Sequence, residues 1–337
     1  MAKEILGTKV YYDEDCDMGF LKGKKITVLG YGSQGHAHAL NLKDSGFEVT
    51  VGLRKESAAW SVAEKDGFQV KITGEAVRDA DVVMVLIPDE VQGEIYTQDI
   101  APNLKEGAYL GFGHGFCIQF KKIIPAPSTN VFMVAPKSPG HLARRTFCQG
   151  SGVPALVAVH QDPAGDTEKV ALAWACGIGS GRSGILPTTF IQETETDLFG
   201  EQAVLCGGIT ALMQTGFEVL TEAGYDPVSA YFECLHEMKL IVDLIYEGGF
   251  SKMRHSVSNT AEYGDYKIGP RIITPAVKEE MKKILAEIKS GEFANEFYDD
   301  RAKTQAYLKE QRAKSEELPI EKVGKELREL MSWIPKE

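Results

Sequence analysis

The chain has 337 residues, 43% of them hydrophobic and 25% charged, with a formal net charge of −11. This composition is typical of a soluble globular protein with room for two domains. The acidic balance and the lack of a basic run argue against nucleic-acid and anionic-membrane partners. No apolar run approaches the ~20 residues of a membrane span, and the N-terminus lacks the apolar core of a signal peptide, so we expect a cytoplasmic protein.

The first half of the chain alternates short β-branched or apolar runs with helix-like segments. Such alternation in units of ~30 residues predicts an α/β fold with a doubly wound parallel sheet, and we assign residues 1–189 to this Rossmann-type domain. Helices are expected at 30–46, 57–67 and 74–79. Strands are expected at 24–30, 48–54, around Val70, and at 81–88, 108–116, 131–137 and 154–160.

After about residue 190 the strand-like runs disappear. Long helical segments follow, so we expect an all-α second domain over residues 190–335. Its helices are predicted at 194–223, at 226–246 before Gly248 and Gly249, at 278–290, and in the charged tail at 300–333.

The six cysteines are spread singly along the chain, without a C-x-x-C pair or a Cys/His cluster of zinc-site spacing. Several lie in apolar segments. We therefore expect buried, reduced thiols.

A glycine-rich sequence lies between the first expected strand and its helix and matches G-x-G-x-x-G. In that context the first glycine makes the turn, the second lets the backbone approach a pyrophosphate, and the third allows helix and strand to pack. The helix N-terminus then faces the phosphates. The sequence predicts a dinucleotide site formed by Gly30, Tyr31, Gly32, Ser33, Gln34 and Gly35.

The end of the second strand bears on the choice between NAD and NADP. An acidic residue there accepts from the ribose 2′-hydroxyl, whereas arginine suits a 2′-phosphate. Arg54, Lys55 and Ser57 favour the phosphate, but Glu56 lies among them and Ala59 offers no hydroxyl. Both NADPH and NADH therefore stay open from these residues.

Two acidic pairs in the helical half have four-residue spacing, Asp197 with Glu201 and Glu233 with Glu237. Residues four apart share one face of a helix, so the two carboxylates of each pair can bind the same cation through oxygen. The neighbours are apolar, where a carboxylate is costly unless a cation neutralises it. We expect Mg²⁺ as that cation; the alternative is that these acids point to solvent.

Six motifs occur together in a fixed order, and in this combination the chain closely resembles the ketol-acid reductoisomerases (acetohydroxyacid isomeroreductases) of the short, class I form over essentially its whole length. They are GYGSQGHAHALNLKDSG at 30–46, FGHGF at 112–116, APKSPGH at 135–141, ETETDLFGEQ at 193–202, ECLHEM at 233–238 and SNTAEYGDY at 258–266.

The resemblance implies an enzyme of branched-chain amino acid biosynthesis. It implies a Mg²⁺-dependent alkyl shift in 2-acetolactate or 2-aceto-2-hydroxybutanoate, followed by reduction with hydride from NADPH or NADH to the 2,3-dihydroxy-3-alkyl acid. It also implies a knotted helical domain, two Mg²⁺ ions per site, and a homodimer or higher homo-oligomer with shared active sites.

The resemblance also assigns roles to single residues. His114, Lys137 and Glu237 match catalytic positions, and Ser258 matches a holder of the substrate carboxylate from the partner subunit. Asp197, Glu201, Glu233 and Glu237 match metal ligands, the last two from the partner subunit. The cofactor-contacting positions that it adds are Asp89, Glu90, Val91, Gln92 and Gly140.

Two other functions stay open at this level. One is a metal-independent Rossmann hydroxy-acid dehydrogenase, in which both acidic pairs would be spectators. The other is a non-catalytic nucleotide-sensing module, which would bind a dinucleotide but need neither His114, Lys137 nor the acids.

Overall fold

A computed structural model of the chain describes residues 3–332, arranged as two compact units, Met1–Thr196 and Asp197–Glu337. Residues 1–2 and 333–335 of the expected domains, and residue 333 of the expected tail helix, lie outside the described residues.

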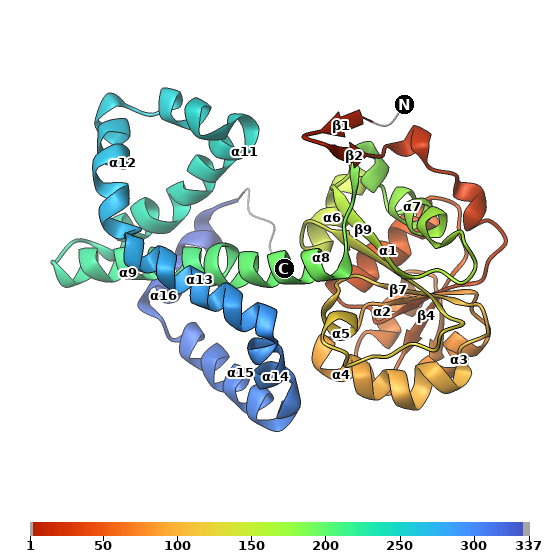
Figure 1. Ribbon diagram of the computed structural model, residues 1–337. Helices are drawn as coiled ribbons and strands as arrows, with labels where there is room; N and C mark the ends of the chain where they lie inside the picture. The colour runs from red at the N-terminus through yellow and green to blue at the C-terminus, as the bar shows by residue number, and fades with distance from the viewer. Residues whose placement is uncertain (1–2, 333–337) are drawn as a thin grey trace. The chain divides into compact units, whose positions relative to one another are not determined.

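The first unit is built on an eight-stranded sheet flanked by helices on both faces, which confirms the expected Rossmann-type fold (Figure 1). The strand order is β10-β9-β8-β7-β6-β3-β4-β5, so the six strands from β8 to β5 have the order 3-2-1-4-5-6 when read from β5 and numbered along the chain. One pairing departs from the all-parallel expectation, because β8 and β9 run antiparallel. The strands are β3 (Ile26–Leu29), β4 (Val49–Leu53), β5 (Gln69–Ile72), β6 (Val82–Val85), β7 (Tyr109–Phe112), β8 (Asn130–Pro136), β9 (Ala155–Gln161) and β10 (Ile185–Pro187).

Helices α1 and α7 pack on the sheet over a large apolar core, and α6 packs against α1. Trp174 of α7 is fully buried and donates its indole N–H to His38 Nδ1 of α1 over 3.2 Å. Burial lowers the pKa of His38 to about 3, so this core histidine is neutral. The helices of this unit are α1 (Ser33–Asp44), α2 (Trp60–Lys65), α3 (Thr73–Arg78), α4 (Asp89–Ile95), α5 (Phe116–Gln119), α6 (Gly140–Cys148) and α7 (Thr167–Gly177), with a π-helical turn, η3 (Tyr96–Ile100), after α4.

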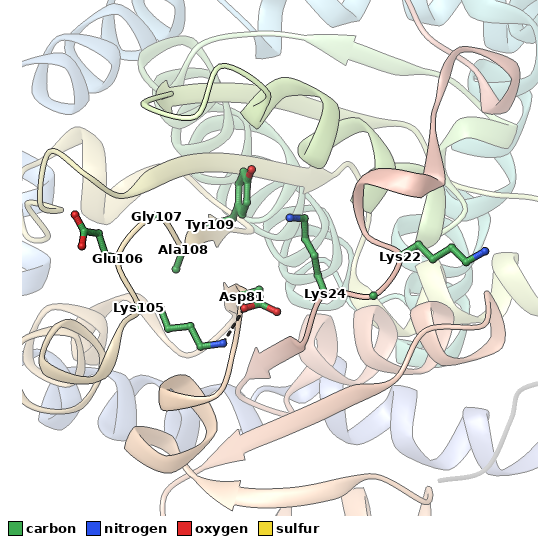
Figure 2. A pocket seen from close by; sticks show the side chains of 9 residues that line it. Lys22, Lys24, Asp81, Lys105, Glu106, Gly107, Ala108 and Tyr109 are labelled. Carbon is green, nitrogen blue, oxygen red and sulfur yellow. Dashed lines mark hydrogen bonds and ion pairs between the residues drawn. The ribbon is translucent and has the colours of Figure 1, made fainter.

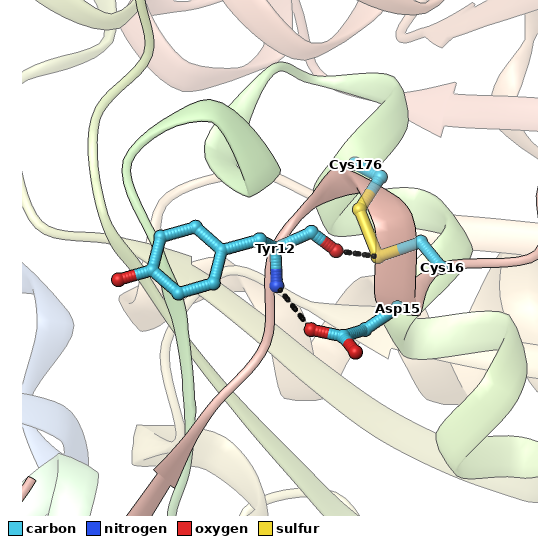
Figure 3. The surroundings of a disulfide bond; sticks show 4 residues. All are labelled: Tyr12, Asp15, Cys16 and Cys176. Atoms are coloured by element: carbon cyan, nitrogen blue, oxygen red, sulfur yellow. Dashed lines mark hydrogen bonds between the residues drawn. A yellow bond between two sulfur atoms is a disulfide. The ribbon is translucent and has the colours of Figure 1, made fainter. Parts of the chain in front are cut away.

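A disulfide between Cys16 and Cys176 ties the N-terminal segment to the end of α7 (Figure 3). The expectation of reduced thiols is therefore wrong for this pair. The segment begins with a hairpin of β1 (Lys3–Ile5) and β2 (Thr8–Val10), and Tyr11 then bridges Ile185 of β10. The Cys16 sulfur lies 3.5 Å from the Tyr12 carbonyl oxygen. This is a contact and not a hydrogen bond, because a disulfide sulfur carries no hydrogen.

The second unit is all-helical in the part of the chain described, as expected. The predicted single helix over 194–223 runs from α8 (Phe190–Phe199) through a π-helical turn, η6 (Gly200–Leu205), into α9 (Gly207–Glu222). Gly249, at φ +74, interrupts α11 at the predicted stop, but the helix resumes beyond it. The remaining elements are α10 (Pro227–Tyr231), π-helical η7 (Phe232–His236), α11 (Glu237–Ser256), α12 (Asn259–Ile272), α13 (Pro275–Ser290), α14 (Glu292–Asp299), α15 (Arg301–Glu316) and α16 (Pro319–Leu330).

The core of this unit is small, and much apolar surface is left uncovered in a single copy. Phe217, Ala230, Tyr231 and Ile320 form its buried centre. The stretch Phe190–Glu222 is long and apolar enough to span a membrane by length and composition. Only 6% of the 18-residue apolar segment within it is buried. Large exposed apolar side chains on these helices include Leu205, Leu212, Val219, Leu240, Val242, Tyr246, Phe250, Tyr263, Tyr266, Ile268, Ile272 and Ile273.

Candidate active site

The predicted cofactor residues and His114 and Lys137 all follow strands of the first unit at one edge of the sheet. Strands β3, β4, β6, β7 and β8 are mutually parallel, so the loops at their carboxyl ends meet there. The strand order reverses between β3 and β6, which is where doubly wound sheets bind dinucleotides.

The glycine-rich loop leaves β3 through Gly30 at φ +93. A Cβ on Gly30 would lie 2.4 Å from the carbonyl oxygen of Leu86, at the end of β6, so only glycine fits. Gly32 and Ser33 are exposed at the start of α1, where backbone N–H groups can meet an anion. Tyr31 differs, because its side chain is buried and donates to Asp66 Oδ2 over 2.7 Å. Only the backbone of Tyr31 is then available to a ligand bound at the loop.

The neighbouring cofactor positions fall into two groups. Arg54 and Lys55 are exposed on the turn after β4, while the Ser57 hydroxyl accepts from the backbone N–H of Ala59 over 3.3 Å. Gln92 is buried on α4 and donates to the carbonyl of Ile87 and to Asp89, so its side chain shapes the turn after β6. Glu90 and Val91 are half-buried in the first turn of α4.

Glu193, in the first turn of α8, joins the predicted catalytic residues of the first unit. Its Oε2 lies 3.0 Å from His114 Nδ1 and also accepts from the backbone N–H of Gly115 over 3.0 Å. Its Oε1 accepts from Lys137 Nζ over 2.9 Å. The Glu193 side chain is 1% exposed, against 21% for His114 and 34% for Lys137. One buried carboxylate therefore orients both partly exposed groups.

Two consequences follow for protonation. Burial by itself raises the pKa of Glu193, but hydrogen bonds and charges from His114 and Lys137 outweigh it and lower that pKa to about 2. Because a carboxylate only accepts hydrogen bonds, the proton of a neutral His114 ring lies on Nδ1. Nε2 is then the nitrogen that can take a proton from a ligand.

The sequence reading missed Glu193, although a signal for it exists. Glu193 lies four residues before Asp197, and Asp197 four before Glu201, so three acids follow one helix face at a constant spacing. The resemblance to the family assigns metal ligands only to the second and third of them. The first of the three is the buried one.

Asp197 lies one turn beyond Glu193 on α8, a single helix that begins in the first unit. His114, Glu193 and Asp197 each offer a ligand atom, and these atoms lie within 4.8 Å of one another. Glu201 follows in the π-helical turn η6 and is exposed. A π-helical turn inside an α-helix is frequent at functional sites, although η3 shows that it also occurs elsewhere in this chain.

The second acidic pair also straddles a π-helical turn. Glu233 lies in η7 and Glu237 opens α11, and both are exposed. Ser258 is the N-cap of α12, exposed, and its hydroxyl accepts from the N–H of Ala261 over 3.2 Å. These residues belong to the second unit, as expected for the helical domain.

A cavity of about 400 Å³ lies elsewhere, at the amino ends of β3, β6 and β7 (Figure 2). Lys105 there pairs with Asp81 over 2.7 Å, and Lys22 points away from that pair. Lys24 lies 4.9 Å from the centre of the Tyr109 ring. These lysines are surface groups with local partners at the edge opposite the phosphate loop, so this cavity is not the candidate site.

Comparison with known proteins decides the family. A sequence model of the NADPH-binding domain of acetohydroxy acid isomeroreductase matches residues 20–184. A model of the C-terminal domain of ketol-acid reductoisomerase matches residues 190–333. The chain belongs to the ketol-acid reductoisomerase family. It is therefore an NAD(P)-dependent oxidoreductase and isomerase with a small-molecule substrate.

Solved structures agree with this family. An NADH-preferring ketol-acid reductoisomerase from an uncultured archean is 49% identical, with a TM-score of 0.94, 96% of this chain covered and 99% of that chain. A semialdehyde dehydrogenase NAD-binding protein from Cupriavidus necator, in complex with calcium and NAD, is 20% identical, with a TM-score of 0.61 and coverage of 79% and 99%. The second likeness shows the fold alone.

Proposed function

We propose that this ketol-acid reductoisomerase converts 2-acetolactate or 2-aceto-2-hydroxybutanoate to the 2,3-dihydroxy-3-alkyl acid, in valine, leucine and isoleucine biosynthesis. The reaction is a Mg²⁺-dependent alkyl migration followed by reduction with a nicotinamide cofactor. The observation that carries the proposal is the His114–Glu193–Lys137 cluster next to Asp197, beside the loop of a dinucleotide fold.

The residues present fit Mg²⁺. The proposed ligands are all carboxylates, the hard oxygen ligands that Mg²⁺ prefers, and the ligand atom of Asp197 lies within 4.8 Å of those of His114 and Glu193. Asp197 and Glu201 would hold the ions from one subunit, and Glu233 and Glu237 from the other. Bound there, two Mg²⁺ ions supply Lewis acidity to the substrate's hydroxyl and ketone oxygens, and reduced nicotinamide supplies the hydride.

The chain's own residues then have distinct tasks. Nε2 of His114 takes or returns a proton, since Nδ1 is held by Glu193. The Lys137 ammonium, fixed by the same carboxylate, stabilises negative charge that develops on substrate oxygen. Glu237, from the other subunit, would help to hold a metal ion next to the substrate. The Ser258 hydroxyl and the N–H groups at the start of α12 bind the substrate carboxylate.

Magnesium dependence is the first test. Oxidation of reduced nicotinamide, followed at 340 nm with 2-acetolactate, is expected to need Mg²⁺ and to fall at least about a thousandfold in Glu201→Gln, because a neutral amide is a poor Mg²⁺ ligand. Glu195→Gln is the matched control, since residue 195 lies on another face of α8. Full turnover in excess chelator would refute the metal dependence and favour a metal-independent dehydrogenase.

The same assay, run with NADH and with NADPH, decides the preferred cofactor. The exposed Arg54 and Lys55 favour a 2′-phosphate. Glu56 and Ala59 favour NADH, as does the likeness to an NADH-preferring enzyme. Arg54 and Lys55 form, with Ser57, the part of the site proposed to contact the ribose end of the cofactor.

We further propose that the working unit is a cytoplasmic homodimer, or a larger assembly of dimers, with shared active sites. The uncovered apolar side chains of the helical unit support this, since soluble monomers rarely expose so large an apolar surface. A second copy would cover exposed apolar side chains of the stretch Phe190–Glu222.

Subunit mixing tests the shared site. Asp197→Ala and Glu233→Ala chains, each inactive alone, are expected to recover about a quarter of normal activity when refolded together, because half the dimers are mixed and each holds one intact site. Mixing either variant with itself is the control. Mixed dimers, separated by affinity tags, that stay inactive would contradict the shared site.

A further inference from the structure

The segment that carries Lys137 lies against the phosphate loop. Residues 137–141 connect β8 to α6, and His141 donates its backbone N–H to Ser33 Oγ over 3.2 Å. Gly140 comes closer still, since a Cβ there would lie 2.1 Å from the Ser33 carbonyl oxygen. The two loops are therefore packed backbone to backbone, with no room for a side chain between them.

Gln34 adds the one side-chain hydrogen bond from the loop to the residue after Lys137. Its Nε2 donates to the backbone carbonyl of Ser138 over 2.9 Å. Its Oε1 is buried, and no hydrogen-bond partner for it exists within residues 3–332. A buried unpaired acceptor costs free energy. Within the described residues, the Gln34 amide is therefore buried and unpaired at its oxygen and hydrogen-bonded to Ser138 at its nitrogen.

Next to this contact, Lys137 is hydrogen-bonded through both its backbone and its side chain. Its backbone N–H donates to the Pro154 carbonyl over 2.8 Å, and its ammonium donates to Glu193. Between these two points the backbone leads directly into Ser138, the residue that Gln34 holds. The phosphate loop and Lys137 are therefore connected through one hydrogen bond and one residue of backbone.

We propose that Gln34 is a positioning residue that couples occupancy of the phosphate loop to the placement of Lys137 beside Glu193. The proposal rests on the proposed function for the role of Lys137. A pyrophosphate bound by the N–H groups at the start of α1 fixes the loop backbone. Gln34 then holds the Ser138 carbonyl more firmly, so the pair that Lys137 forms with Glu193 is more fully populated when the cofactor is in place.

The test uses Gln34→Met in the full-length protein, because methionine keeps the length and volume of glutamine but cannot donate. Gln161→Met is the matched control. Gln161 is also half-buried and its Nε2 also donates to backbone carbonyls, those of Ala126 and Thr129, but these precede β8, whereas Lys137 follows it at the other end of the strand.

Two readouts separate positioning from a general structural effect. The first is acetylation of Lys137 by a small active ester, measured by peptide mass spectrometry with exposed Lys283 as internal reference. It is run with and without ADP-ribose, or its 2′-phosphate if NADP is the cofactor, which carries the pyrophosphate but no nicotinamide. The second is the split between kcat and the KM for reduced nicotinamide.

In the native protein, ADP-ribose is expected to slow Lys137 acetylation at least about threefold, because the pair with Glu193 becomes more fully populated and a paired ammonium reacts less. In Gln34→Met this ratio falls to about one, kcat falls about tenfold, and the KM for the nicotinamide changes less than about threefold. Gln161→Met behaves as the native protein.

A Gln34→Met protein that keeps both the native acetylation ratio and the native kcat would overturn the coupling. So would a variant whose ADP-ribose affinity falls as much as its kcat, because Gln34 would then act on cofactor binding. Failure of the proposed function is a different result: the native protein would not oxidise reduced nicotinamide with acetolactate, whatever the acetylation data show.

Discussion

Glu193→Gln is expected to lower kcat about a hundredfold or more, with a small change in the KM for reduced nicotinamide. Glutamine has nearly the same shape, but its amide N–H₂ must face either the Lys137 ammonium or the Gly115 N–H and His114 Nδ1, all of which donate to the carboxylate. Loss of such an orienting partner typically costs 10- to 100-fold, and here two groups lose theirs together. Steady-state kinetics at saturating Mg²⁺ and cofactor measure the effect.

Glu195→Gln is the matched control, because it removes the same charge two residues further along the same helix, on another face. We expect it to keep kcat within about twofold of the native value. If both variants lose activity equally, the loss reflects the charge of α8 and not the contacts of Glu193. If neither loses activity, His114 and Lys137 do not depend on Glu193 for their placement.

The pH dependence of stability gives a second readout on the same variant. The pKa of Glu193 is lowered from 4.5 to about 2 in the folded protein, so its ionised form stabilises the fold fully above pH 4.5 and progressively less as the pH falls toward 2. At pH 3 the native protein should have lost about 2 kcal/mol of this contribution. The stability difference between native and Glu193→Gln, from urea unfolding, should therefore shrink between pH 5 and pH 3. A difference that stays constant would contradict a lowered pKa.

Most strands of the sheet in the first unit were predictable because they are short apolar runs bounded by glycine or polar residues, whereas the three-residue β10 was not predicted. The β3 run KKITVLG and the β6 run DVVMVLIP are examples. Local pattern also located the interruption at Gly249, where only a positive φ lets the chain turn. The antiparallel entry of β9 was not predictable, since strand direction depends on how the chain crosses the sheet and not on the composition of the strand.

The residues of the candidate site likewise fall into those that the sequence locates and those that it does not. The phosphate loop and the acidic pairs have fixed local spacings, so sequence alone locates them. Glu193 has the same spacing but a different environment: packing buries it between residues 78 or 79 and 56 positions away. The Gln34–Ser138 bond likewise joins residues 104 positions apart. Contacts of this kind are set by tertiary packing and leave no periodic trace in the sequence.

The Cys16–Cys176 disulfide is the clearest case of such a long-range contact, and its removal is expected to lower the melting temperature of the protein by about 10 °C. The bond spans 160 residues, so it removes much of the loop-closure entropy of the unfolded chain, worth about 3–5 kcal/mol. In a unit of this size each kcal/mol corresponds to about 2–4 °C. Differential scanning fluorimetry of Cys16→Ser against the native protein measures the shift.

Reduction with dithiothreitol tests whether this stabilisation comes from the Cys16–Cys176 disulfide. Both sulfurs belong to half-buried residues within reach of a small thiol, so the reductant should lower the melting temperature of the native protein to that of Cys16→Ser and leave the variant unchanged. Cys148→Ser, at an exposed free thiol, is the matched control and should respond to dithiothreitol as the native protein does. An equal response in Cys16→Ser would trace the effect to another part of the chain. Six alkylatable thiols in the denatured, unreduced native protein would show that the bond is absent, and the stability of the N-terminal segment would then rest on contacts such as the bridge between Tyr11 and Ile185.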